Sequence, residues 1–310
     1  MKFYRTNFEK FEIMCLQETH GRKKEITRTV QSLGFKKGVF SLANSQAKGV
    51  AILWRNPIEG GENTWTDNEG RVAIAHLQLE NQPIVVVGIY APNLNATILA
   101  REEYVTYLIS VRHMIERAKQ KANTDNIIMM GDFNLIMNAE LDSYSKNPKV
   151  YEVPKEELVD LTDNFALQDC FRQLNGDTKA YTFSRHNENP TKGIYNRLDY
   201  IYASDAILRV AKDCNHIAVG KTDHLAVQLI LNEKKERKKL GLWRHNDSYN
   251  KDVEFITLMS TVIKEAQECS FELKVWSRLS IYILKLKLWS GLQSFTMELK
   301  MSMRKNTIWH

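Results

Sequence analysis

Hydrophobic and polar positions along the chain fall into blocks that predict strands and helices in alternation. Apolar runs with little polar alternation are typical of strands buried on both faces. They cover residues 11–17, 48–54 and 127–130. Further β-rich runs cover residues 71–79, 84–90, 181–183, 198–203 and 225–231. Glu80-Asn81-Gln82-Pro83 separates two of these runs and predicts a hairpin.

Three blocks place apolar residues on one face at helical spacing. They cover residues 21–33, 101–118 and 155–165, and Gly34 predicts the end of the first block. Residues 138–154 are polar and predict a loop. Strands that alternate with helices and also form hairpins favour a mixed α/β sandwich over a purely parallel fold.

The basic excess of the chain lies in its C-terminal part. Residues 233–310 carry 15 Lys and Arg against 9 Asp and Glu, an excess that equals the net charge of +6 for the whole chain. Residues 1–232 are therefore balanced, and they do not form a broadly basic nucleic-acid surface. After Asn232 the pattern changes to a basic run and Lys-studded helical segments. We therefore predict two domains, 1–232 and 233–310.

The composition narrows the class of protein. Hydrophobic residues make up 43% and charged residues 26% of the chain, which is typical of a soluble globular protein. Cys15, Cys170, Cys214 and Cys269 form no CxxC pair, and no His spacing completes a zinc set, so we expect free thiols in a reducing compartment. We find no signal peptide and no apolar run of the roughly 18 residues that a membrane helix needs. We expect a nuclear or cytoplasmic protein without membrane contact.

Polar side chains capable of chemistry lie at or just beyond the ends of several predicted strands. In Gly131-Asp132-Phe133-Asn134 a carboxylate and an amide follow an apolar run. The carboxyl ends of strands in α/β sheets commonly carry the functional site. The residues that share this position are Glu18, Tyr90, Asn93, Asp132, Asn134, Asp199, Asp223 and His224. Each alone is explained by a turn, a cap or a surface charge, but eight together favour a site.

The order of these motifs resembles the endonuclease/exonuclease/phosphatase superfamily, which includes exonuclease III-like abasic-site endonucleases. The motifs are Leu16-Gln17-Glu18-Thr19, Tyr90-Ala91-Pro92-Asn93, Gly131-Asp132-Phe133-Asn134, Arg197-Leu198-Asp199-Tyr200 and Thr222-Asp223-His224. Within that superfamily the chain is most similar to the endonuclease domain of LINE-type non-LTR retrotransposons. The features behind this closer likeness are Cys15-Leu16-Gln17-Glu18-Thr19-His20, Lys48-Gly49-Val50-Ala51-Ile52 and Tyr181-Thr182-Phe183.

The resemblance implies a four-layer sandwich of two mixed β-sheets flanked by helices. It implies a phosphodiester hydrolase that nicks double-stranded DNA and depends on Mg²⁺, with Mn²⁺ as an alternative. Hard oxygen ligands suit Mg²⁺, which neutralises charge on the phosphoryl oxygens. The resemblance implies Glu18 as the chief metal ligand, with Asp223 in support.

The resemblance also assigns catalytic roles. It implies that Asp132 orients or deprotonates the attacking water and that Asn134 positions this water and a phosphate oxygen. His224 would contact the scissile phosphate, held in tautomer and angle by Asp199. The side chains implied to contact the substrate are Tyr90, Asn93 and Thr182. No Ser or Cys nucleophile is needed, so we expect no covalent intermediate.

The chain departs from the family pattern at its start. The family opens with a strand that carries a metal-side Asn and with a helix, but only 17 residues precede Glu18 here. Asn7 lies too close to Glu18 to take that place. We therefore expect the first strand of the sandwich to be missing. A truncated, catalytically inactive remnant that only binds a partner is one alternative to a nicking endonuclease.

Two other activities are found in proteins of the same fold. An exonuclease III-like abasic-site repair nuclease is the nearer alternative, and a phosphoinositide or sphingomyelin phosphodiesterase ranks last.

The tail from Leu242-Trp243-Arg244 looks like the linker that precedes reverse transcriptase in retrotransposon polyproteins. Its Leu284, Leu288 and Leu292 lie at helical spacing, which predicts contact with such a domain. Target preference is expected in loops 138–154 and 184–193.

Overall fold

The computed structural model describes residues 11–20, 23–35, 37–43, 48–145, 148–185, 193–219 and 222–232, together with Val253, Thr257, Ser260 and Thr261. Contacts divide the chain into two units, Met1–Glu233 and Lys234–His310. In the second unit the four described residues are helical. The leucine row at 284–292 lies outside the described residues, so its contact with a reverse transcriptase stays a prediction.

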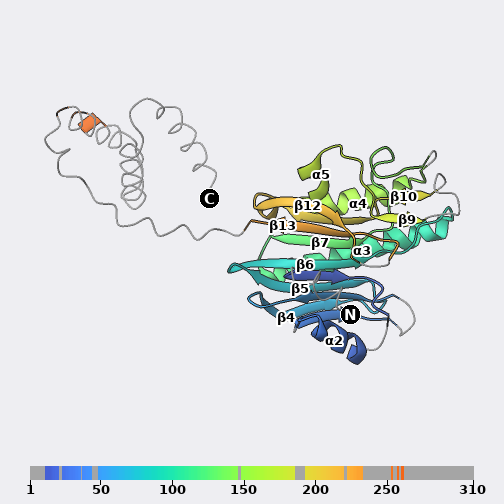
Figure 1. Ribbon diagram of the computed structural model, residues 1–310, viewed down its shortest axis with the longest axis horizontal. Helices are drawn as coiled ribbons and strands as arrows, with labels where there is room; N and C mark the ends of the chain where they lie inside the picture. Colours follow the sequence, from blue (N-terminus) through green and yellow to red (C-terminus); the bar gives the residue numbers. More distant parts are fainter. Residues whose placement is uncertain are drawn as a thin grey trace. The chain divides into compact units, whose positions relative to one another are not determined.

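The first unit contains strands and helices in alternation (Figure 1). Its elements are β1 (Ile13–Leu16), α2 (Lys23–Ser32), β2 (Lys37–Ser41), β3 (Val50–Trp54), β4 (Glu59–Thr66), β5 (Val72–Leu79), β6 (Gln82–Tyr90), α3 (Ile98–Ala122), β7 (Ile127–Asp132), α4 (Glu152–Asn164), β8 (Leu167–Asp169), α5 (Cys170–Asn175), β9 (Phe183–Arg185), β10 (Ile194–Asn196), β11 (Asp199–Ser204), α6 (Asp205–Leu208), β12 (Ala211–Ile217) and β13 (Ala226–Leu231). No helix among the described residues is both long and apolar enough to cross a bilayer.

A six-stranded mixed sheet forms the centre of the first unit. Its strand order is β4-β5-β6-β7-β11-β8, in which β6 and β7 run parallel and the other neighbours antiparallel. A second layer holds the antiparallel sheets β1-β3-β2 and β12-β13. β9 and β10 pair as a separate ribbon. The order β6-β7-β11 places the ends of three strands side by side, although they lie far apart in the sequence.

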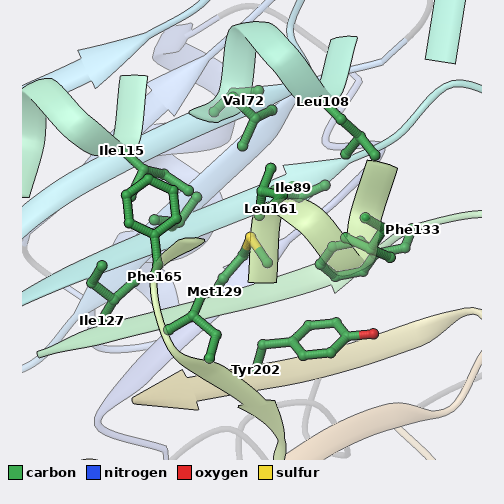
Figure 2. Close-up of a cluster of buried hydrophobic side chains, with 14 of the residues drawn as sticks. Val72, Ile89, Leu108, Ile115, Ile127, Met129, Phe133, Leu161, Phe165 and Tyr202 are labelled. Atoms are coloured by element: carbon green, nitrogen blue, oxygen red, sulfur yellow. The ribbon is translucent and has the colours of Figure 1, made fainter. Parts of the chain in front are cut away.

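Three hydrophobic clusters separate four layers. The first cluster joins α3 and α4 to one face of the central sheet and includes Leu108 and Met129 (Figure 2). The second cluster lies on the opposite face, against the second sheet layer, and includes Ile52 and Ile128. In the third cluster α2 covers the outer face of β3 at Leu53. Neighbouring residues of β3 and β7 therefore face different clusters, which explains their apolar runs. The predicted four-layer α/β sandwich is confirmed.

The predicted hairpin around residues 80–83, which joins β5 and β6, is also confirmed. Glu80 and Asn81 take φ values of 48° and 64°, and Leu79 pairs with Gln82. A two-residue turn with positive φ at both positions matches the right-handed twist of the paired strands.

Several elements were not predicted or begin at a different residue than predicted. Neither β4 nor β12 was predicted, because β4 is the edge strand of the central sheet and β12 is polar at most positions. Edge strands need no continuous apolar run. Helix α4 begins at Glu152, inside the predicted loop, and β9 begins at Phe183 rather than at Tyr181. Residues 1–10 lie outside the described residues, so the missing first strand stays a prediction.

Gly131 is a backbone requirement of β7. Its φ is +143°, and a Cβ at this position would collide with the carbonyl of Ile89 on β6. The strand continues in the sheet at this position, because Gly131 pairs with Tyr200 on β11 and with Ile89 on β6. Glycine is needed because β6 approaches this backbone closely.

We expect Gly131→Ala to lower the free energy of unfolding by about 3 kcal/mol, because it adds both backbone strain and overpacking. Urea denaturation measures the change. Gly176→Ala is the matched control, because Gly176 also has a positive φ of 56° but open space around its Cβ. Its loss is expected to be about 1–2 kcal/mol, from backbone strain alone. Equal losses in the two variants would contradict the steric argument.

Candidate active site

The ends of β6, β7 and β11 bring three of the predicted site residues together. Asp132 is the last residue of β7, and its register partners are Tyr90 on β6 and Asp199 on β11. The Asp132 carbonyl accepts a hydrogen bond from the backbone N–H of Ala91 at 2.9 Å. Sheet pairing therefore fixes two carboxylates and a phenol at one edge of the central sheet.

His224 joins this group through Asp199. Its Nδ1 lies 2.8 Å from Asp199 Oδ2, and its ring centroid lies 5.0 Å from that of Phe183. Ligand atoms of Asp132, Asp199 and His224 all lie within 4.8 Å of one another. The carboxylate holds one imidazole nitrogen, which leaves Nε2 as the nitrogen that can meet a substrate.

The titration of these groups is strongly perturbed. Burial, and then the charge of Asp199, raise the pKa of Asp132 from 3.8 to about 8. Burial acts to lower the pKa of His224, but the hydrogen bond and charge of Asp199 outweigh it and raise the pKa to about 9. The site therefore contains a buried carboxyl group that takes up and releases a proton near neutral pH, as general acid–base chemistry requires.

These two shifts predict how the stability of the metal-free protein depends on pH. The folded pKa of Asp132 lies above its unfolded value, so stability falls as pH rises from about 4 to about 8. The raised pKa of His224 stabilises the fold below about 6.5, and this contribution is lost as pH rises through about 9. We expect Asp132→Asn to gain Tm over the wild type progressively as pH rises from 4 to 8.

Thermal unfolding in EDTA across that pH range measures this gain. Asp160→Asn, on an exposed position of α4, is the control and should track the wild type at every pH. A constant offset between Asp132→Asn and the wild type would contradict the pKa argument.

Glu18 and Tyr90 form a second part of the site. Tyr90 Oη donates to Glu18 Oε1 at 2.5 Å, and Glu18 itself is exposed. Burial, and then Glu18, raise the pKa of Tyr90, so the phenol remains a donor at neutral pH. Arg71, which the sequence analysis did not single out, lies 5.4 Å from the Tyr90 ring and donates Nη1 to the Tyr90 carbonyl. Glu18 is thus held at the rim of the site by a residue that is itself anchored.

Asn134 is oriented by the strand ends around it. Its φ is 48°, and its backbone N–H donates to Asp132 Oδ1 at 2.8 Å. Its Nδ2 donates to the carbonyl of Ala91 at 3.0 Å. Asn tolerates this left-handed conformation because its short polar side chain bonds locally. The amide oxygen is therefore the group of Asn134 that can meet a water or a substrate.

The remaining predicted residues lie in different surroundings. Asn93 and Asp223 are exposed, and Asp223 lies next to His224 in the chain. Thr182 is buried, and its Oγ1 accepts the backbone N–H groups of Leu198 and Asp199 at 3.0 and 3.1 Å. This geometry makes Thr182 a support for Asp199. Its contact with a substrate stays a prediction, as do the substrate role of Asn93 and the ligand role of Asp223.

A buried ion network supports this edge of the sheet, and the sequence analysis missed it. Arg197 is 1% exposed and donates Nε to Asp142 Oδ1 at 2.8 Å, while its Nη2 lies 2.7 Å from Asp169 Oδ2. Arg172 also pairs with Asp142. The Arg197 backbone N–H donates to the Asp142 carbonyl at 2.7 Å. The network thereby ties the loop after β7 to the segment that leads into Asp199.

We expect Arg197→Met to lower the free energy of unfolding by about 3–5 kcal/mol, because it leaves the buried Asp142 and the partly buried Asp169 without their shared partner. Arg209→Met is the matched control, since Arg209 pairs with Asp205 in the open, at 70% and 55% exposure. Removal of such an exposed pair changes stability by about 1 kcal/mol or less. Urea denaturation compares the two variants, and similar losses would contradict a central role for the network.

The donors at the site fit a hard divalent cation. Glu18, Asp132 and Asp199 supply carboxylate oxygens, the ligands that Mg²⁺ prefers. His224 Nδ1 is engaged by Asp199, so oxygen donors dominate the remaining set. The set contains no cysteine, which argues against a soft metal.

Comparison with known proteins identifies the family. A family model described as the Endonuclease/Exonuclease/phosphatase family matches residues 5–224, more than half of the chain. The protein belongs to this family. The matched region extends from before β1 to His224, so this endonuclease/exonuclease/phosphatase domain includes every predicted site residue.

One curated relative matches part of the chain. A Xenopus laevis protein described as "Transposon TX1 uncharacterized 149 kDa protein" is 28% identical over 130 residues, which cover 42% of this chain and 10% of that protein. The match thus spans only about a tenth of the curated relative.

Two solved structures illustrate the shared fold. The AP endonuclease LMAP from Leishmania major superposes with a TM-score of 0.63 at 19% identity, over 75% of this chain and 82% of that one. An AP endonuclease from Archaeoglobus fulgidus gives 0.59 at 20% identity, over 74% and 93%. At such identities the likeness is one of fold.

Proposed function

We propose that the protein is a Mg²⁺-dependent phosphodiester hydrolase that nicks one strand of double-stranded DNA, with Mn²⁺ as an alternative ion. The convergence of Asp132, Asp199 and His224 within 4.8 Å is the observation that carries this proposal. It combines an acid–base carboxyl, an oriented imidazole and oxygen donors for a hard cation. Family membership supports the same class of reaction.

Each residue of the proposed site has a separate role in hydrolysis. Asp132, with its pKa near neutrality, takes the proton of the attacking water, and the Asn134 amide oxygen orients that water. His224, protonated and fixed by Asp199, donates to a non-bridging phosphate oxygen as negative charge develops. Glu18 and Asp223 are the proposed ligands of the cation, which supplies charge neutralisation on the phosphoryl and leaving oxygens when bound.

The retrotransposon type of nuclease is the finer part of the proposal. It rests on the Transposon TX1 relative from Xenopus laevis and on the motifs similar to LINE-type endonucleases. In such elements a nick that leaves a 3′-hydroxyl primes reverse transcription. The tail from residue 234 would then lead towards a polymerase domain.

Relaxation of a supercoiled plasmid tests the proposed activity. The purified chain should convert supercoiled DNA to the nicked form with Mg²⁺ and not with EDTA. Persistent supercoils from a folded sample with Mg²⁺ would refute the activity for this chain and favour a domain that only binds its partner.

An abasic-site repair nuclease is the second candidate, because two of the similar solved structures are described as AP endonucleases. Cleavage of a duplex with one abasic site, compared with the same intact duplex, separates the two functions. Preference for the abasic duplex would favour repair, and equal cleavage would argue against it.

A further inference from the structure

Three tyrosines gather where the β9–β10 ribbon meets the loop after β7. The ring centroids of Tyr144 and Tyr195 lie 6.0 Å apart, those of Tyr144 and Tyr181 lie 6.5 Å apart, and those of Tyr181 and Tyr195 lie 6.2 Å apart. We call this group the tyrosine cluster. Each ring is within contact range of the other two, at interplanar angles of 60°, 72° and 46°, so the three rings pack as one aromatic cluster.

Tyr144 is the member of the cluster that faces solvent. Its side chain is 64% exposed, and among the described Phe, Tyr and Trp residues it is the only exposed one. Its backbone is fixed, because its N–H donates to the Tyr195 carbonyl at 2.9 Å and Ser143 bridges to Asn196. An ordered backbone that holds one exposed aromatic ring in contact with two partly buried ones makes a surface of the kind that ligands stack on.

The tyrosine cluster lies close to the catalytic residues. Tyr181 directly precedes Thr182, whose Oγ1 lies 3.1 Å from the backbone nitrogen of Asp199. With consecutive Cα atoms about 3.8 Å apart, the Tyr181 Cα lies within about 10 Å of the Asp199 backbone nitrogen. That limit corresponds to about three nucleotide steps, because one strand of B-form DNA advances about 3.4 Å per nucleotide.

We propose that the tyrosine cluster, with Tyr144 outermost, stacks an unpaired base of the DNA substrate a few nucleotides from the cleaved phosphodiester. This inference rests on the proposed function. The occupant is DNA because the cluster lies within a few nucleotide steps of His224 and Asp199, the residues proposed to meet the cleaved phosphate.

The chemistry of the surroundings supports a base as the ligand. Asp142 and Arg197, next to the cluster in the chain, neutralise each other in the interior, so the cluster presents ring faces rather than a charge. Exposed Lys179 and Arg185 flank it along the chain and can attract the adjoining phosphates. Stacking on aromatic rings tolerates any base, so the cluster selects for an unpaired nucleotide rather than for a sequence.

Binding measured without turnover tests the cluster directly. In EDTA, the full chain is titrated into a duplex that carries 2-aminopurine in a two-base mismatch, placed about two to six nucleotides from a defined nick site. At one of these positions the wild type should quench the probe by stacking. Tyr144→Ala should lose the quench and bind about tenfold more weakly. Tyr144→Phe should retain both, and Ile109→Ala, an exposed apolar residue of α3, should match the wild type.

Cleavage measured with the same duplexes gives a second readout. A mismatch at the stacking position removes the energy needed to unpair the base. The wild type should therefore cleave that duplex with a kcat/KM about tenfold higher than the fully paired one, mainly through KM. Tyr144→Ala should cleave the two alike.

The outcomes separate this inference from the proposed function. Suppose that the wild type nicks DNA and that Tyr144→Ala changes neither quench, affinity nor mismatch preference. This result would overturn base stacking by the tyrosine cluster and leave the proposed nuclease activity standing. A fall of kcat alone at unchanged affinity would overturn it too, because it would show a structural role. If the wild type fails to nick, the proposed activity fails, and duplexes with the 2-aminopurine mismatch moved along the strand decide the binding. A quench that Tyr144→Ala loses would still support stacking of a base, and no quench at any position would overturn it.

Discussion

Asp132→Asn is expected to lower the rate of plasmid nicking by about 10²–10⁴-fold at saturating Mg²⁺ and DNA, the range for loss of a general base. Asp132 is 7% exposed, lies in register with Tyr90 and Asp199, and has a pKa of about 8. Asparagine keeps the shape and the hydrogen bond from Asn134 but cannot accept the proton of the attacking water. The loss should therefore appear in kcat, with DNA affinity little changed.

The control for this substitution removes a carboxylate without touching the site. Asp163→Asn changes an exposed residue of α4 and should nick at the wild-type rate. The Tm of Asp132→Asn near pH 8 should equal or exceed that of the wild type, since it removes a buried ionisable group. A fall of less than tenfold in kcat would show that another group activates the water.

Glu18→Gln is expected to weaken the apparent affinity for Mg²⁺ by about a hundredfold or more. Nicking at millimolar Mg²⁺ should then nearly disappear and return in part as the metal concentration rises. The reason is that an amide keeps the hydrogen bond from Tyr90 but loses the charge that attracts a hard cation. Changes in groups that only orient a metal ligand typically cost 10–100-fold. Removal of a ligand's own charge should cost at least as much.

Tyr90→Phe provides the graded comparison. It removes the 2.5 Å hydrogen bond to Glu18 but leaves the carboxylate. The apparent affinity for Mg²⁺ should therefore fall about tenfold, less than in Glu18→Gln. Glu12→Gln, exposed just before β1, should behave as the wild type. Loss of activity in Glu18→Gln that no Mg²⁺ concentration relieves would contradict the ligand role.

Much of the fold follows from local patterns. The apolar runs at 48–54 and 127–130 became β3 and β7 because their neighbouring residues face different hydrophobic clusters. The turn at Glu80 and Asn81 formed where the sequence placed it. The polar strands β4 and β12 could not be read in this way, because they form only through pairing with β5 and β13. A strand that depends on its neighbour carries little signal of its own.

The sequence by itself determined the layered α/β architecture and the kinds of groups at the strand ends. Only the tertiary structure decided which of these groups meet. Asp132 and Asp199 are adjacent because β7 and β11 pair, and His224 is held by Asp199 across 25 residues. The buried Arg197 network and the support of Asp199 by Thr182 also appear only there. The physical reason is that periodicity reports which side of an element is buried, whereas sheet order and register set the distances between side chains that lie far apart in the sequence.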